Sequence, residues 1–228
     1  MDIIPQLIVN SIIAGAIYTM VALGFNLIYG TAKFFDLGYG ALTAAGGYAV
    51  FYLYKTLGFN LYVSVIVGAI VAGVIGFAIY RLVYAPLRER KSSSMVLLVG
   101  SLGAFTALQA IIAILFTSQF QTLTQSAGAG KVFNIFGGII TEVQLIILIT
   151  GLMIMVVMAL VLKYSIFGKA IKAVGDDEEV SKIVGINTKK VIGKVFFIGS
   201  AIAGLAGILV GFDTGIEPTM GLSLLLKG

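Results

Sequence analysis

The sequence contains no cysteine, no histidine and no tryptophan, and only three prolines in 228 residues. Disulfides, thiol chemistry, imidazole catalysis and histidine–metal ligation are therefore excluded. Charge is scarce as well, because only 11% of the residues are charged, against about 25% in an average soluble domain. Hydrophobic residues make up 59% of the chain. Such a chain cannot cover a water-exposed surface with polar groups, so a lipid bilayer is its expected solvent.

Six segments are long enough and poor enough in charge to cross the hydrocarbon core as helices. They cover residues 6–29, 37–54, 58–80, 95–117, 143–162 and 195–212. No positive residue precedes Lys33, so the first segment is expected to stay in the membrane rather than be cleaved as a signal peptide. The apolar run GLSLLLKG that follows the sixth segment is too short to span, which predicts further C-terminal spans in a longer chain. We predict an all-α, polytopic transmembrane bundle, a single domain over residues 1–228.

Positive residues are concentrated in two loops. Residues 81–94 and 163–194 hold eleven of the fifteen lysines and arginines, and two expected spans separate the two loops. The positive-inside rule places both loops in the cytoplasm, which puts the N-terminus and the loop near residues 118–141 outside. The net charge of +5 follows from this topology and does not require a nucleic-acid partner. The expected location is the plasma (inner) membrane.

The longest charged passage, GKAIKAVGDDEEVSKIVGINTKKVIGK at residues 168–194, has the pattern of helices lying at a membrane face. Asp176 is a suitable N-cap, with Glu179 three residues later in the capping-box relation. Gly185 is a helix stop, and Asn187 can cap the helix that leads into the next span. Between Glu179 and Gly185 lies an apolar stripe at helical spacing, formed by Val180, Ile183 and Val184. We expect two short helices bent at residues 185–187.

Two interpretations of this passage compete. An amphipathic helix at this position can rest on lipid headgroups. However, the acidic run at residues 176–179 would be repelled by an anionic leaflet. A compact apolar stripe beside these acidic residues is better explained as a docking surface for a soluble protein.

The passage resembles the ATPase-coupling loop in permease subunits of ABC importers for branched-chain amino acids. Three further stretches are similar to the same family: ALGFNLIYGTAKFFDLGYGALTAAGGY, RLVYAPLRER, and GSAIAGLAGILVG with IEPTMG. The resemblance implies that the coupling loop contacts an ATPase, with the stripe in the docking site and Lys169 and Lys172 on its polar rim. The coupling residues implied in this way are Gly168, Lys169, Ala170, Lys172, Ala173, Val180, Ile183, Val184, Gly185, Ile186 and Asn187.

The resemblance also implies the partners. They are a homologous permease subunit, two cytoplasmic ABC ATPases and an external solute-binding protein, while this chain binds no cofactor and performs no bond chemistry. Residues 37–40 read Leu-Gly-Tyr-Gly where the family often has Phe-Ala-His-Gly, so no role of that histidine is available. The alternatives are an ABC permease for urea, amides or other amino acids, and a nucleotide-independent channel or carrier. The scarcity of charge within the spans argues against ion coupling.

The block FNLIYGTAKFFDLGYG is interrupted by glycines near a membrane face, as in the broken helices that line transport paths. Asn26, Tyr29 and Tyr39 are therefore candidate residues of the translocation path. Two alternatives stay open. The block can be a plain cytoplasmic turn with Lys33 and Asp36 solvated, and Asn26 can serve as a hydrogen-bonding contact between helices.

Small residues recur at four-residue spacing on two of the expected spans. One row contains Gly68, Ala72 and Gly76, and the other contains Gly199, Ala203, Gly207 and Gly211. Such rows allow helix backbones to approach closely. We expect them to serve packing and not substrate binding.

Overall fold

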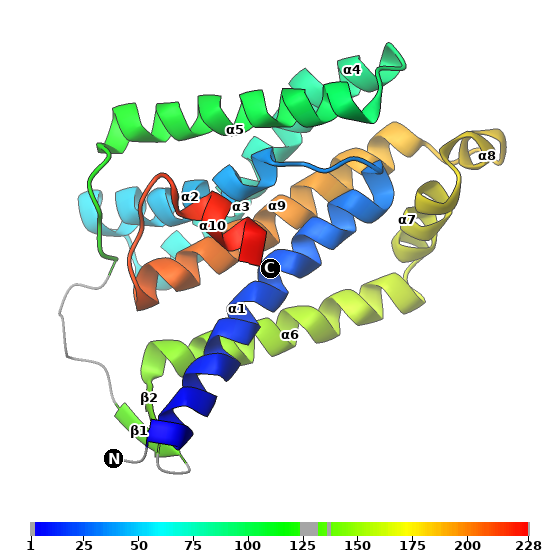
Figure 1. Cartoon of the computed structure of the whole chain (residues 1–228). Coiled ribbons are helices and arrows are strands. Elements are labelled where there is room, and N and C mark those ends of the chain that lie inside the picture. Colours follow the sequence, from blue (N-terminus) through cyan, green and yellow to red (C-terminus); the bar gives the residue numbers. More distant parts are fainter. Residues whose placement is uncertain (1–2, 124–131, 136–137, 228) are drawn as a thin grey trace.

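The computed structural model describes residues 3–123, 132–135 and 138–227 as a helical bundle with one small hairpin (Figure 1). The predicted all-α fold is confirmed. The elements in chain order are α1 (Ile3–Ala32), α2 (Gly38–Val50), η1 (Phe51–Thr56), α3 (Leu61–Ile79), η2 (Tyr80–Tyr84), α4 (Ala85–Glu89), α5 (Ser94–Phe116), β1 (Val132–Ile135), β2 (Gly138–Thr141), α6 (Glu142–Tyr164), α7 (Ile166–Asp176), α8 (Glu178–Ile183), α9 (Thr188–Asp213) and α10 (Met220–Lys227). Elements η1 and η2 are π-helical turns that continue α2 and α3.

Five helices in the described part of the chain are long and apolar enough to cross a membrane: Ile4–Ala32, Leu61–Glu89, Ser94–Phe116, Glu142–Tyr164 and Thr188–Asp213. The expected second span, 37–54, is not among these five helices. It forms one continuous helix as α2 and η1, which is long enough to cross but too rich in glycine and tyrosine to match the hydropathy of these five. The physical reason is its composition: α2 is rich in glycine, alanine and tyrosine, and nearly all its residues are buried against other helices. A helix surrounded by protein needs no lipid-compatible surface.

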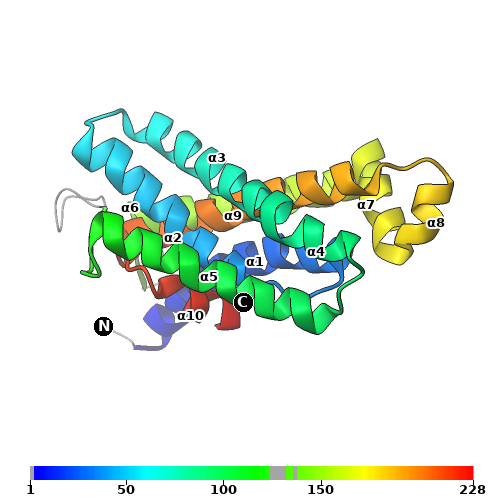
Figure 2. The same cartoon turned by 90° about the horizontal axis from the view of Figure 1, so that it is seen from above.

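Helix α9 is the central element of the bundle and packs against α1, α2 and α3 (Figure 2). Glycines allow these backbones to touch. A Cβ atom at Gly46 of α2 would lie 2.5 Å from the Cα of Gly204 in α9, and one at Gly24 of α1 would lie 2.8 Å from the carbonyl oxygen of Gly199. At Gly207, the added carbon would overlap the carbonyl oxygen of Thr43. The expected packing role of these small residues is confirmed.

The two basic loops lie at the same end of the bundle, as their charges predict. Figures 1 and 2 show α4, α7 and α8 together at this end, which we name the α8 end. At the opposite end, β1 and β2 form an antiparallel pair with Val132 opposite Thr141. In the loop near residues 118–141, residues 124–131 and 136–137 lie outside the described residues. Thr141 then starts α6 with a capping box that includes Gln144.

Candidate functional site

Helix α7 is an amphipathic helix that packs on the end of the bundle. Its N-cap is Ser165, whose side chain accepts a hydrogen bond from the backbone of Gly168 at 2.8 Å. Gly168 lies so close to the last turn of α6 that a Cβ atom would be 2.6 Å from the Cα of Leu162. Ile171 and Val174 are buried, whereas Lys169 and Lys172 face outward. Helix α7 is therefore fixed to the spans by one face and presents the other, basic face.

Helix α8 begins one residue later than the sequence pattern predicts. Asp176 ends α7, and Asp177 is the N-cap of α8, where its carboxylate accepts bonds from Glu179 and Val180 backbone N–H groups at 2.8 and 3.0 Å. The prediction of Asp176 as the cap is thus wrong by one position. Both residues are aspartates, so composition alone could not separate them. The negative charges at the helix start complement its macrodipole.

The predicted apolar stripe is exposed. Val180, Ile183 and Val184 are 53%, 84% and 69% exposed, respectively. We name these three residues the α8 ridge. Gly185 follows with a φ of +88°, a conformation that favours glycine, and its N–H donates to the carbonyl of Lys182 at 3.1 Å. Three exposed apolar side chains on one short helix outside the spans form a patch typical of a protein contact.

Asn187 caps α9, as predicted, by accepting a hydrogen bond from the backbone of Lys190 at 3.0 Å. The expectation of two short helices here is corrected in one respect. Only α8 is short, because the second helix runs without interruption through residue 213 as α9. Any displacement of α8 therefore acts directly on the N-terminal turn of the central helix.

Glu178 connects α8 to its surroundings. Its carboxylate forms salt bridges with Arg88 of α4 and with Lys182, the latter at 2.9 Å, and it accepts a bond from the Thr188 hydroxyl at 3.3 Å. Burial raises the pKa of this carboxyl, but the hydrogen bonds from Lys182 and Arg88 outweigh this effect and hold the pKa below its ordinary value. Glu178 is therefore charged at neutral pH and joins α4, α8 and α9.

Arg88 extends this connection to α1. Besides pairing with Glu178, its guanidinium donates to the carbonyl oxygen of Ala32, the last residue of α1. Lys189 of α9 pairs with Glu89 of α4 at 2.7 Å beside it. The ends of three long helical units thus meet at α8. Sequence reasoning missed the pairing of Arg88 with Glu178, although an arginine in one basic loop and an acidic residue in the first turn of a helix in the other were the available signal.

The structure places the other predicted coupling residues around this connection. Gly185, Asn187, Lys169 and Lys172 are exposed, Ala170, Ala173 and Ile186 are half-buried, and Gly168 is buried. Ser181, between the ridge residues, is 2% exposed and faces the bundle. The exposed members of the predicted set therefore lie on α7, on α8 and in the turn before α9, and the ridge residue Ile183 is the most exposed of those on α8.

The three candidate path residues do not share a surface. Asn26 and Tyr29 are exposed on α1, whereas Tyr39 is fully buried and donates a hydrogen bond from its hydroxyl to the carbonyl of Val21 at 3.0 Å. Tyr39 therefore serves to pack α2 against α1, and we do not retain it as a path residue.

Helix α1 carries a polar stripe along its exposed face that sequence reasoning missed. Ser11, Gly15 and Thr19 lie four residues apart on this face, and Asn26, Tyr29 and Lys33, which begin seven residues after Thr19, lie three or four apart; all six are exposed. A Cβ atom at Gly15 or Gly30 would have no neighbour within 4 Å. The stripe extends from Ser11 to Lys33 with an interruption around Ala22, and a period of 3.6 applied to the polar residues would have found it. Polar groups in a span rarely face lipid.

The connection between α1 and α2 contains a buried carboxyl. Asp36 is 1% exposed and accepts a hydrogen bond from the hydroxyl of Tyr84 in η2 at 2.6 Å. Burial raises its pKa from 3.8 to about 6, although the bond from Tyr84 and backbone groups of α2 oppose the shift. The expectation that Asp36 is solvated is wrong, because α2 and η2 close over it. Lys33 is exposed, as expected for a turn residue.

Among the residues that the structure describes, no group of three or more acidic side chains could hold a metal ion. The arrangement at the α8 end contains an exposed apolar ridge and a charged connection to three helices. Ion pairs and hydrogen bonds thus connect α8 to the ends of α1, α4 and α9.

Comparisons with known proteins place this geometry in context. The model of a family described as the permease component of the branched-chain amino acid transport system matches residues 7–228. The high-affinity branched-chain amino acid transport system permease protein LivH of Escherichia coli (strain K12) is 29% identical over 97% of this chain and 75% of its own length. The corresponding permease protein BraD of Pseudomonas aeruginosa is 26% identical over 95% of this chain and 74% of its own.

A more distant relative is the fructose import permease protein FruF of Bifidobacterium longum. It is 25% identical over 84% of this chain and 51% of its own length. No solved structure matches the chain significantly.

Proposed function

Because the chain belongs to the family of permease components of branched-chain amino acid transport systems, we propose that it is the membrane subunit of an ATP-driven importer of branched-chain amino acids. It is a multi-pass membrane protein with apolar spanning helices, and its family is one of transport subunits. LivH and BraD support this substrate class because each is similar over almost the whole chain. The shorter similarity to FruF supports another small solute less well.

The importer contains four kinds of component. This chain pairs with a homologous permease, two cytoplasmic ATPases bind the α8 end, and an external protein delivers the substrate to the other end. The N-terminus lies outside the plasma (inner) membrane, because the α8 end carries most of the positive charge and faces the cytoplasm.

The α8 ridge is the observation that carries the proposal. Its apolar side chains insert into a groove on the ATPase, and Lys169 and Lys172 contact the rim of that groove. Closure of the ATPase pair on ATP moves α8. The bonds of Arg88 and Glu178 then pass this displacement to α1, α4 and α9 together. No bond chemistry and no cofactor of this chain are needed for that step.

The polar stripe of α1 lines the translocation path. Asn26 and Tyr29 lie on this stripe, and hydroxyl and amide groups there replace the water around the charged ends of an amino acid. The side-chain hydroxyls of Ser11 and Thr19 are also bonded to the carbonyls of Leu7 and Gly15 of their own helix, at 2.8 and 2.7 Å, so they cost little when unoccupied. The partner permease covers the far side of this path.

Substitution Ile183→Asp tests the docking role. A buried aspartate on the ridge would lose about 2 kcal/mol or more of docking free energy, roughly thirtyfold in affinity. We expect the assembled complex to lose leucine uptake and the ATPase to stop copurifying, while membrane insertion is retained. Ile166→Asp is the matched control, because Ile166 is 87% exposed but lies at the start of α7, away from the ridge. Equal uptake by both variants would contradict the proposal.

Cross-linking tests the contact itself. The chain has no cysteine, so Ile183→Cys introduces a single thiol on the ridge and Ser181→Cys introduces one facing the bundle. We expect an ATP-sensitive cross-link from position 183 to cysteines in the surface groove of the ATPase, and none from position 181. A thiol at position 183 that reacts freely with soluble reagents in the assembled complex would reject ATPase docking there.

Competition assays test the substrate class. Uptake of labelled leucine by the reconstituted importer should be inhibited by unlabelled isoleucine and valine, and not by urea or fructose. Uptake that proceeds without ATP would favour the channel or carrier alternative.

A further inference from the structure

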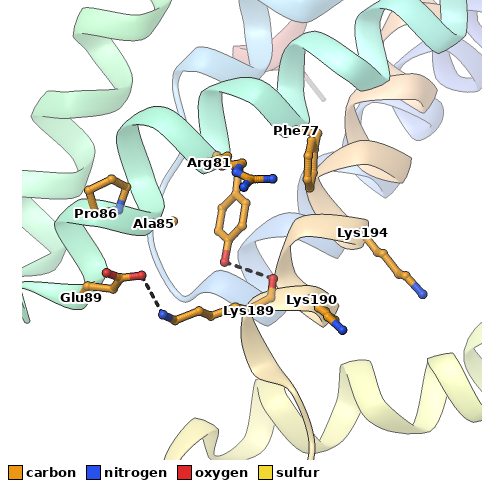
Figure 3. Close-up of a pocket in the computed structure, with 9 residues that line it drawn as sticks. Phe77, Arg81, Ala85, Pro86, Glu89, Lys189, Lys190 and Lys194 are labelled. Carbon is orange, nitrogen blue, oxygen red and sulfur yellow. Dashed lines mark hydrogen bonds and ion pairs between the residues drawn. The ribbon is translucent and has the colours of Figure 1, made fainter.

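A groove of about 550 Å³ lies between the helix formed by α3, η2 and α4 and the N-terminal turns of α9. Figure 3 shows Phe77, Arg81 and Glu89 on one wall and Lys189, Lys190 and Lys194 on the other. The floor of the groove is largely apolar, because Phe77, Tyr80, Ala85 and Pro86 line it. The groove belongs neither to the α8 ridge nor to the polar stripe of α1.

The groove lies at the boundary of the hydrocarbon core. The uncharged stretch from Leu61 to Tyr80 has about 20 residues, which as a helix measures about 30 Å, the thickness of the core. Arg81 follows immediately. In α9, the uncharged stretch from Val195 to Phe212 is of similar length, and Lys194 precedes it. Two independent helices thus place a cation at the same depth, where lipid phosphates lie.

The cations of the groove are not neutralised within the chain. Lys189 pairs with Glu89 at 2.7 Å and closes the outer end. In the part of the chain that the structure describes, no ion pair involves Arg81, Lys190 or Lys194. Lys194 is additionally held 5.8 Å from the ring centre of Phe167, which fixes its position without cancelling its charge. Arg81 therefore borders the apolar floor from one wall without an ion-pair partner among the described residues, and Lys190 and Lys194 start from the other wall with their side chains pointing away from Arg81 (Figure 3).

We propose that this groove binds one anionic phospholipid, of the phosphatidylglycerol or cardiolipin class, at the cytoplasmic membrane boundary. Arg81 binds the phosphate, the exposed Lys190 and Lys194 side chains turn toward it from the opposite wall, and an acyl chain lies along Phe77. Basic pockets between spanning helices on the cytoplasmic side are suited to such headgroups. A free phosphate would satisfy the cations, but it would leave the apolar floor exposed. The lipid joins the end of α3 to the start of α9, directly beside the Lys189–Glu89 pair.

The absence of tryptophan provides the assay. Phe77→Trp introduces a single fluorophore in the groove. Leu82→Trp is the control, because the side chain of Leu82 is 75% exposed on another face of the same helix. Both full-length variants are reconstituted in equimolar phosphatidylcholine and phosphatidylglycerol vesicles in which one lipid at a time carries bromine, a quencher. One cation near an anionic headgroup is worth roughly a fivefold change in partition.

We expect brominated phosphatidylglycerol to be preferred at least roughly fivefold over brominated phosphatidylcholine at position 77, with no such preference at position 82. The preference should disappear in R81Q/K190Q/K194Q and persist in K163Q/K172Q, which removes positive charge elsewhere at the α8 end. Native mass spectrometry of the unsubstituted chain gives a second measurement that needs no tryptophan. It should retain phosphatidylglycerol over phosphatidylcholine.

Three results would overturn the proposal. Equal quenching by the two lipids at position 77, with no retained phosphatidylglycerol in the mass spectrum, would remove the lipid. Loss of the preference on adding millimolar inorganic phosphate would assign the cations to a soluble anion. Absence of quenching by either lipid in the assembled importer, with quenching in the isolated chain, would assign the groove to a protein subunit.

Discussion

Substitution Gly207→Ala should destabilise the bundle even though alanine is the better helix former. Replacing glycine by alanine inside a helix gains about 1 kcal/mol. At Gly207, however, the new carbon would overlap the carbonyl oxygen of Thr43 in α2 and lie 2.9 Å from the Cα of that residue. Both obstacles are backbone atoms, so no rotamer change can relieve them, and α2 and α9 must move apart. Overpacking of this kind costs about 1–3 kcal/mol.

The matched control is Gly103→Ala in α5, where an added carbon has no neighbour within 4 Å. This variant should show the propensity gain alone, and because that gain is common to both variants, they should differ by the overpacking cost of about 1–3 kcal/mol in free energy of unfolding. For a chain of this size, the difference corresponds to at least roughly 2 °C in Tm. The measurement is thermal unfolding of each purified variant in the same detergent. Indistinguishable Tm values would refute the inferred contact between α2 and α9.

Two further predictions concern charged residues at the α8 end. Glu178→Gln should weaken the pairing with Arg88 and Lys182 and lower ATP-driven uptake roughly fivefold, because a partly exposed pair is worth about 1 kcal/mol. The control Glu179→Gln should leave uptake unchanged. Equal uptake rates for the two variants would contradict the proposed role of Glu178 in connecting α8 to α4. Asp36→Asn should flatten the pH dependence of stability. Asp36 has a pKa of about 6 in the fold against 3.8 ordinarily, so between these values only the folded state keeps the proton. The stability of the unsubstituted chain therefore falls as pH rises through this window, by about 3 kcal/mol. Unfolding curves of the variant and the unsubstituted chain that change in parallel from pH 4 to pH 7 would contradict this prediction.

The hydrophobic pattern predicted most of the long helices and their location in the membrane, because a chain with so few charges can place its long apolar segments only in lipid. The helix ends in the coupling loop were predictable for the same local reason: Gly185 and Asn187 act through their own neighbouring backbone groups. The burial of the second helix was not predictable, because the pattern records the absence of charge and does not record what surrounds the helix. Burial of α2 by α9, α3 and α5 is a tertiary property.

The missed residues share a cause. Arg88 and Glu178 are separated by 90 positions, and Asp36 and Tyr84 by 48, so their pairing depends on the arrangement of helices in space. In the sequence, each is an ordinary charged or polar residue near a span end. The exposed residues of the ridge were found because exposure and spacing are both encoded locally in α8.

The glycine contacts at the centre of the bundle also limit how the protein can move. Where α2 and α9 meet through Gly46 and Gly204, the touching atoms belong to the backbone, so no side chain there can change rotamer to accommodate sliding. Forming this contact costs no side-chain conformational entropy, and it has no second arrangement of similar energy to switch into. A displacement arriving at Thr188 is therefore carried through α9 and α2 as a rotation of one rigid body. In the proposed importer, the bending that alternating access requires must therefore occur at the periphery, in helices such as α1, where Gly15 and Gly30 leave open space.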